Sequence, residues 1–150
     1  MNYQKEKERH ISYCGSYCKQ CDWFTGRNRQ VFQAASDALE LFGFKKLLKD
    51  KVDIKNLKLG LKLLANSSIC PGCKAEIAQN PAKDRCQIRQ CTHANGLDLC
   101  VECSNFPCKL LKTNPGVIRF GCIENLKQIK TKGLKYWVDR QWQEHIRQKI

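Results

Sequence analysis

Histidine is scarce in this chain, and the motifs of most hydrolytic and transfer enzymes are missing from it. Three of the 150 residues are histidine, namely His10, His93 and His145. None stands in a recognisable pattern with a carboxylate and a nucleophile. Neither H-E-x-x-H, nor the H-x-E with P-C-x-x-C of zinc deaminases, nor a glycine-rich phosphate loop occurs. The sequence therefore offers no recognisable catalytic residues, and we expect a binding module, with an enzyme that has an unusual metal site as the alternative.

Long apolar runs are also absent from the sequence. No stretch approaches the ~18 consecutive apolar residues of a membrane-spanning helix, and the polar opening MNYQKEKERH contains no apolar segment of a signal peptide. We therefore expect a cytoplasmic protein without a membrane partner. In a reducing cytoplasm, cysteines persist as thiols or metal thiolates and not as a disulfide framework.

Acidic residues are few in comparison with basic ones. The chain has 14 Asp and Glu against 27 Lys and Arg, which gives a formal net charge of +13. This charge permits an anionic partner such as nucleic acid, although no recognition motif for nucleic acid occurs and metal-bound thiolates would lower the charge. Lysines at helical spacing, such as Lys55, Lys58 and Lys62, are most simply the solvated face of a helix. An unidentified protein is the expected partner, and nonspecific nucleic-acid binding is the alternative.

Cysteine, in contrast, is abundant and grouped. Ten of the eleven cysteines fall into four short-spaced groups, C-x3-C-x2-C, C-P-G-C, C-x4-C and C-x2-C-x4-C. Their members are Cys14, Cys18, Cys21, Cys70, Cys73, Cys86, Cys91, Cys100, Cys103 and Cys108. Thiolates two to four residues apart on a tight turn can bind one ion at ~2.3 Å, which is the geometry of a tetrahedral zinc site. We therefore predict these ten as candidate metal ligands for about two zinc ions, and leave Cys122 as a structural or free thiol.

The division of the ten thiols between two ions is open at the level of sequence. The C-P-G-C turn of Cys70 and Cys73 would pair with Cys100 and Cys103 in a ribbon-like four-thiolate site. The six remaining thiols would then supply a second site with spare ligands. His93 is a further candidate ligand because it follows a cysteine by two residues, but a surface or supporting role suits it better.

An iron–sulfur cluster is the alternative cofactor. The C-x3-C-x2-C spacing matches the cysteine triad that holds a four-iron cluster in radical S-adenosylmethionine enzymes. Those enzymes also need a partial or full βα barrel, and no alternating pattern of strands and helices follows Cys21. An electron carrier needs four thiolates per cluster, which the grouped cysteines could supply twice. Zinc leads because it suits clustered thiolates and tolerates many turn types.

Apolar spacing predicts a mainly α protein, a small helical domain with metal-stapled, cysteine-rich loop segments and little or no sheet. Apolar residues within 31–42 recur at intervals of three and four, which marks a buried helix face. Asp53 is a candidate N-cap for the next helix. Ile123, Leu126 and Ile129 mark a helix that ends near Gly133, and a last helix follows it.

We expect one domain over residues 1–150. Its polar first segment, 1–12, should be frayed. The cysteine-rich segment 66–115 should be held mainly by metal, because no core of ordinary size can be drawn from it. An Asn-Gly pair in that segment, Asn95-Gly96, would suit a hairpin turn.

The ordered cysteine groups also resemble a known family. In chain order the motifs are Y-C-G-S-Y-C-K-Q-C, C-P-G-C, C-Q-I-R-Q-C, C-V-E-C-S-N-F-P-C-K-L-L and I-K-T-K-G-L-K-Y-W-V, over roughly Ile11 to Trp142. The set resembles a cysteine-rich domain-of-unknown-function family found mainly in anaerobic bacteria and archaea. Its members are similar in carrying ten such cysteines and are supposed to bind zinc, without an assigned reaction. The resemblance implies metal binding and no substrate, and the anaerobic setting keeps the iron–sulfur alternative open.

Overall fold

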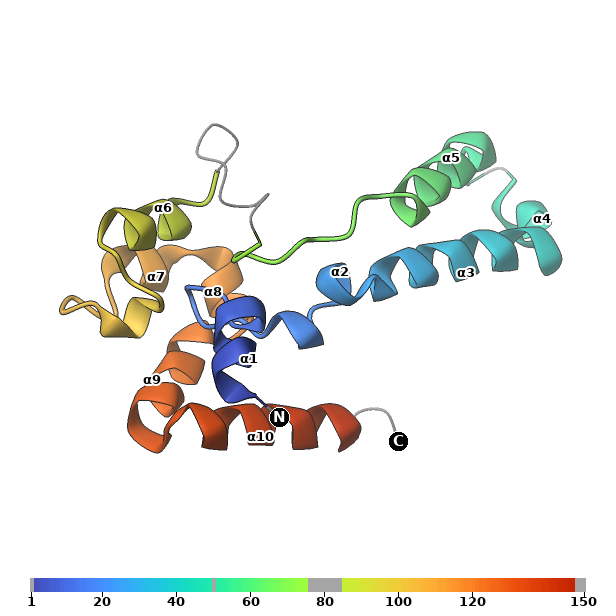
Figure 1. Cartoon of the computed structure of the whole chain (residues 1–150). Helices are drawn as coiled ribbons and strands as arrows, with labels where there is room; N and C mark the ends of the chain where they lie inside the picture. Colours follow the sequence, from blue (N-terminus) through green and yellow to red (C-terminus); the bar gives the residue numbers. More distant parts are fainter. Residues whose placement is uncertain (1, 50, 76–84, 148–150) are drawn as a thin grey trace. The chain divides into compact units, whose positions relative to one another are not determined.

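The computed structural model describes residues 2–49, 51–75 and 85–147 (Figure 1). Within these ranges the chain forms ten α-helices, and the single β pairing is an isolated bridge between Ile11 and Tyr17. The prediction of a mainly α fold with little or no sheet is confirmed. None of the helices in the described ranges is long and apolar enough to cross a membrane.

The chain divides into two compact units. Unit 1 comprises residues Met1–Gln20 and Pro71–Ile150, and unit 2 comprises Cys21–Cys70. The division falls inside the span for which the sequence predicted a single domain. Each unit has its own packing and is described separately.

Unit 1 carries the main hydrophobic core. Its helices are α1 (Tyr3–His10), α6 (Gln87–Ala94), α7 (Lys109–Thr113), α8 (Pro115–Arg119), α9 (Cys122–Lys132) and α10 (Leu134–Arg147), with 3-10 turns at Cys18–Gln20 and Cys100–Glu102 (Figure 1). Ile11, Leu99, Leu126 and Trp137 are almost fully buried in this core. Trp137 of α10 packs edge-on against Tyr17 with ring centroids 5.5 Å apart. Residues far apart in the sequence therefore share one core, and the two helices predicted before and after Gly133 both contribute to it.

The first segment of the chain differs from the frayed start that the sequence predicted. It forms α1, whose first turn is capped by the Asn2 side chain. Glu6 is buried and accepts a hydrogen bond from the Tyr17 hydroxyl at 2.8 Å. Tyr3 donates to Asp139 of α10 at 2.9 Å. A helix held by polar tertiary contacts has no apolar stripe, so periodicity could not reveal it.

The cysteine-rich segment 66–115 is more helical than expected in its described part, which excludes residues 76–84. The hairpin expected at Asn95-Gly96 is wrong, because these residues end α6. The Gly96 amide donates to the His93 carbonyl and the Leu97 amide donates to the Thr92 carbonyl. Gly96 has a φ of +61°, so the pair forms a left-handed helix end instead of a strand turn.

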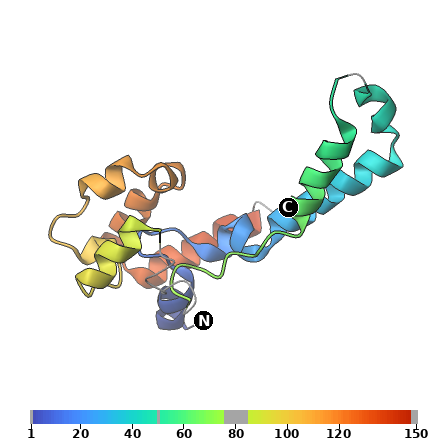
Figure 2. The ribbon, with the colours of Figure 1, turned by 90° about the horizontal axis from the view of Figure 1, so that it is seen from above.

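Unit 2 is a helical hairpin. It contains α2 (Asp22–Thr25), α3 (Arg27–Leu41), α4 (Phe44–Leu48) and α5 (Ile54–Ala65), and α3 and α5 lie side by side in both views (Figures 1 and 2). Asp53 caps α5 as predicted, since its side chain accepts from the Asn56 amide at 3.0 Å. The two ends of the unit meet where the Cys70 amide donates to the Trp23 carbonyl at 3.0 Å.

The core of unit 2 is thin. Among its described hydrophobic side chains, Leu39 and Ala65 alone are fully buried, whereas Val31 is 55% exposed and Phe42 is 71% exposed. The helix face predicted within 31–42 is therefore only partly buried, because Leu39 is buried whereas Phe42 at its end is exposed. Fourteen of the large hydrophobic residues in the described part of the chain are exposed, and eleven of these belong to unit 2, namely Trp23, Val31, Leu41, Phe42, Phe44, Leu47, Val52, Leu59, Leu63, Leu64 and Ile69.

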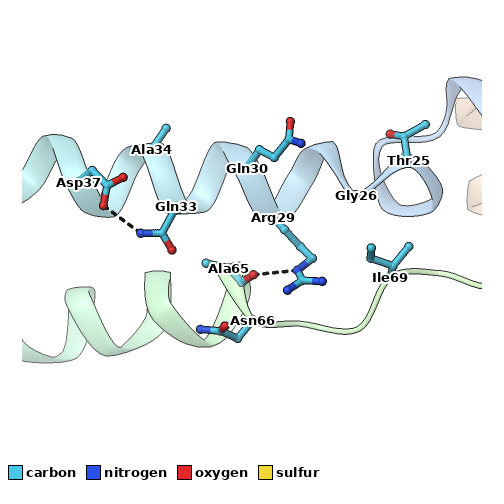
Figure 3. A pocket seen from close by; sticks show the side chains of 10 residues that line it. All are labelled: Thr25, Gly26, Arg29, Gln30, Gln33, Ala34, Asp37, Ala65, Asn66 and Ile69. Atoms are coloured by element: carbon cyan, nitrogen blue, oxygen red, sulfur yellow. Dashed lines mark hydrogen bonds between the residues drawn. The ribbon is translucent and has the colours of Figure 1, made fainter.

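An open groove of about 560 Å³ lies on unit 2 (Figure 3). It lies beside the contact in which the Arg29 Nε donates to the Ala65 carbonyl at 2.9 Å. Gln33 and Asp37 of α3 are among its polar lining residues.

Candidate metal centre

Unit 1 contains eight of the ten cysteines predicted as ligands. They are Cys14, Cys18, Cys73, Cys86, Cys91, Cys100, Cys103 and Cys108. The other two, Cys21 and Cys70, are the first and last residues of unit 2. All eleven cysteines are free thiols.

Cys73 has three of these thiols as electrostatic neighbours. Burial raises the pKa of Cys73 to about 12, and the neighbouring Cys18, Cys14 and Cys86 raise it as well, because a thiolate at Cys73 would be repelled by theirs. These neighbours come from the segment before α2 and from the N-cap of α6. The fold thus gathers thiols from three of the four sequence groups around Cys73.

Cys100 is the centre of a second set. Burial raises its pKa to about 12, and Cys14, Cys108, Cys91 and Cys103 add to the rise. Cys91 lies in α6, and Cys108 is the N-cap of α7. The Cys103 amide donates to the Cys100 carbonyl at 3.2 Å, so the C-x2-C segment forms a tight turn. The shared neighbour Cys14 indicates that the two sets are adjacent.

The turn at Cys14 holds its sulfur among hydrogen-bond donors. The Cys14 Sγ lies 3.2 Å from the Ser12 Oγ and 3.7 Å from the Ser16 Oγ. A hydrogen bond from Cys122, with further ones from Ser12 and Ser16, lowers the pKa of Cys14 to about 5. A thiolate is the form that binds metal, and these hydrogen bonds favour the thiolate of Cys14.

Gly15 makes this turn possible, because a tight turn beside Cys14 requires a small residue. Its φ is +95°, a conformation that residues with a side chain rarely adopt. A Cβ at this position would lie 2.7 Å from both the Cys122 carbonyl oxygen and the Leu126 Cγ. The glycine therefore lets the Cys14 turn approach α9 directly.

Cys122 is a functional candidate that sequence reasoning left aside. It is fully buried at the start of α9, and its Sγ lies 3.1 Å from the Ser16 Oγ. Its hydrogen bond with Cys14 raises the pKa of Cys122 and lowers that of Cys14. A lone cysteine in sequence gives no signal for such a contact, which depends on tertiary packing.

The histidines and the C-P-G-C turn have other partners. The His93 Nε2 hydrogen-bonds the Tyr13 hydroxyl at 2.9 Å, and the His10 ring lies 3.7 Å from Glu6. The side chain of His145 is outside the described part. Next to Cys73, the nearly buried Lys74 donates to the Lys7 carbonyl at 3.1 Å and so fixes the turn against α1.

The thiols of each set are neighbours without forming a closed coordination shell. Among the described residues, no group of three or more Cys, His, Asp or Glu side chains is close enough together to hold an ion as it stands. The available donors near Cys73 and Cys100 are thiols, and thiolates are the soft ligands that zinc and iron–sulfur clusters take. The donor chemistry therefore fits such a group.

The thiols that neighbour Cys73 favour a division of the cysteines between two ions that differs from the one predicted from the sequence. The sequence paired Cys73 with Cys100 and Cys103, whereas the thiols that act on Cys73 are those of Cys14, Cys18 and Cys86. Spacing predicts which cysteines can form a local turn, but tertiary contacts decide which turns meet.

The fold and the cysteine content together define the class of this protein. It is a mainly helical, cysteine-rich protein whose thiols lie in small sets. The family model described as "Protein of unknown function (DUF3795)" matches residues 10–113, more than half of the chain. The chain therefore belongs to this family, and the resemblance to a domain-of-unknown-function family is confirmed. No curated protein and no solved structure matches the chain.

Proposed function

We propose that this protein is an interaction module whose unit 1 is held together by two structural zinc ions. One ion would be bound by Cys14, Cys18, Cys73 and Cys86, and the other by Cys91, Cys100, Cys103 and Cys108. The observation that carries this proposal is that the half-buried Cys73 and the buried Cys100 each have several thiols of other sequence groups as neighbours.

Electrostatics explains why such sets favour a cation. Several thiolates that share a buried region repel one another and lose hydration, so without a counterion they stay protonated. A bound zinc ion would supply the compensating positive charge, and the site would exchange protons for metal. Cys14, whose pKa is lowered by its hydrogen bonds, is the natural first ligand.

The ligand type supports a structural role rather than a catalytic one. A site with four thiolates leaves no open position for substrate or water, whereas catalytic zinc keeps one. A rigid surface for a partner needs nothing beyond the metal-held fold. In this proposal Cys21 and Cys70 are spare ligands at the two ends of unit 2.

The proposed partition predicts which substitutions remove one metal. In the Cys18→Ser, Cys86→Ser double variant, one zinc ion of two should be lost, and the Cys91→Ser, Cys103→Ser variant should lose the other, because two hydroxyls replace two thiolates in one set only. Native mass spectrometry of the folded proteins counts the ions directly. The matched control, Cys21→Ser with Cys70→Ser, should retain both.

Loss of an ion in the Cys21, Cys70 control would contradict this partition and move a site toward unit 2. Loss of both ions in each of the other two variants would contradict the existence of two separable sets. Iron and sulfide in place of zinc would instead support the iron–sulfur alternative with the same ligands.

A further inference from the structure

Cys122 contacts Cys14 but belongs to neither of the two proposed metal sets. The two thiols are hydrogen-bonded to each other. The Ser16 hydroxyl lies beside both of them, 3.1 Å from the Cys122 Sγ and 3.7 Å from the Cys14 Sγ. The two sulfur atoms therefore lie together, although their residues are far apart in the sequence.

The backbones that carry these two thiols are also in contact. A Cβ at Gly15 would lie 2.7 Å from the Cys122 carbonyl oxygen. The Asn125 side chain of α9 donates to the Gly15 carbonyl at 3.0 Å and so holds the Cys14 turn against the start of this helix. Such close packing is what a disulfide needs, since it joins Cα atoms that are only about 4.4–6.8 Å apart.

The two thiols differ in their access to solvent. Cys14 is half-buried, whereas Cys122 is fully buried at the start of α9. A dissolved oxidant therefore reaches the Cys14 sulfur first, and Cys122 is placed to react with the oxidised product. An accessible thiol beside a second, resolving thiol is the arrangement found in redox-sensitive proteins.

From these contacts we infer that Cys14 and Cys122 are a redox pair that a peroxide converts to a disulfide, and that this oxidation releases the metal ion bound through Cys14. The release rests on the function proposed above, in which Cys14 is a zinc ligand, whereas formation of the disulfide does not. A sulfur in a disulfide is no longer a thiolate, so the set of Cys14 would keep three ligands of four.

The oxidation takes place in two steps, here with hydrogen peroxide as the oxidant. The Cys14 sulfur attacks one peroxide oxygen, the O–O bond breaks, and a sulfenic acid and one water molecule form. The Cys122 sulfur then attacks the Cys14 sulfur, and the S–O bond breaks. The hydroxyl group leaves with the thiol proton as a second water molecule. The two thiols lose two electrons in all, and these electrons reduce the peroxide to water.

The second thiol also keeps the oxidation reversible. A sulfenic acid that meets no thiol is oxidised further by peroxide to a sulfinic acid, which ordinary reductants do not repair. A disulfide, in contrast, is reduced by exchange with another thiol. Cys122 thus protects Cys14 from irreversible oxidation and allows the metal to bind again.

Peptide mapping of the full-length, zinc-loaded protein tests this inference. One equivalent of hydrogen peroxide should join Cys14 to Cys122 and release about one zinc ion of two, which a chromogenic chelator counts. A dithiol reductant should restore the lost ion. Chymotrypsin cleaves after aromatic residues, so cuts after Tyr13 and Tyr17 separate Cys14 from Cys18. Mass spectrometry of the blocked digest then identifies the linked fragments.

The Cys122→Ala variant removes the resolving thiol. After the same treatment, the sulfenic acid on Cys14 that dimedone traps should rise by at least about 10-fold over the wild type, because no adjacent thiol consumes it. The matched control is Cys21→Ser, which removes a thiol from the same sequence group as Cys14. This variant should still form the disulfide with Cys122.

The wild-type map decides the inference even if Cys122→Ala does not fold. Cys14 that is left unoxidised, or joined to another cysteine, would overturn the redox pair. A disulfide between Cys14 and Cys122 without loss of zinc would overturn the metal release and remove Cys14 from the proposed ligands. A protein that contains no zinc but forms this disulfide would uphold the redox pair and overturn the proposed function alone.

Discussion

Stripping the metal from the protein with a chelator should unfold unit 1. A structural zinc ion contributes roughly 10–16 kcal/mol of apparent binding free energy that is also folding free energy, and a whole domain is stable by only about 5–15 kcal/mol. The fluorescence of the buried Trp137 should therefore shift to longer wavelength and the far-ultraviolet helical signal should fall. Titration with zinc should restore both signals, with an end point near two equivalents per chain.

Magnesium added to the stripped protein in place of zinc is the control for ionic strength and should restore neither signal, because Mg²⁺ prefers oxygen ligands. A stripped protein that kept its full thermal stability would contradict a structural role for the metal.

Replacement of Trp137 by alanine should cost about 3–5 kcal/mol of unfolding free energy, the range for large aromatic residues removed from a core. Trp137 is fully buried on α10, and its ring packs edge-on against Tyr17. The Trp137→Phe variant should lose less than half as much, because it keeps an aromatic ring there. The Trp137→Phe substitution removes no hydrogen bond, because the indole N–H of Trp137 has no partner among the described residues.

Chemical denaturation of the metal-loaded proteins measures both values. The neighbouring Tyr136→Ala serves as the reference for an exposed aromatic residue on the same helix and should change stability by less than about 1 kcal/mol. If Trp137→Ala costs no more than Tyr136→Ala, then α10 does not form part of the core described for unit 1.

Local signals in the sequence predicted several helices. The Asp53 cap sets the start of α5, and the apolar spacing of Ile123, Leu126 and Ile129 predicts α9, which ends before Gly133 as expected. These features depend on neighbouring residues along one helix, and such residues can be read from the chain alone.

Features that depend on tertiary contacts could not be read in this way. The helix α1 depends on distant partners of Tyr3 and Glu6, and the apolar spacing of α3 gave no indication that Leu39 would be buried while Phe42 stays exposed. The Asn95-Gly96 pair favours a strand turn or a helix end equally, and the helical residues before it decided the outcome.

The same limit applies to the candidate metal centre. Spacing singled out ten cysteines. It could not reveal that Cys14 contacts Cys122, or which thiols surround Cys73, because these neighbours come from separate segments of the chain. Both findings belong to the packing of unit 1.

Metal analysis of protein purified without oxygen, combined with visible and X-ray absorption spectroscopy, tests the central claim most directly. We expect a colourless protein with about two zinc ions per chain, each surrounded by four sulfur atoms at ~2.3 Å. A brown protein that contains iron and acid-labile sulfide would contradict the zinc account. A folded protein without metal would contradict metal binding altogether.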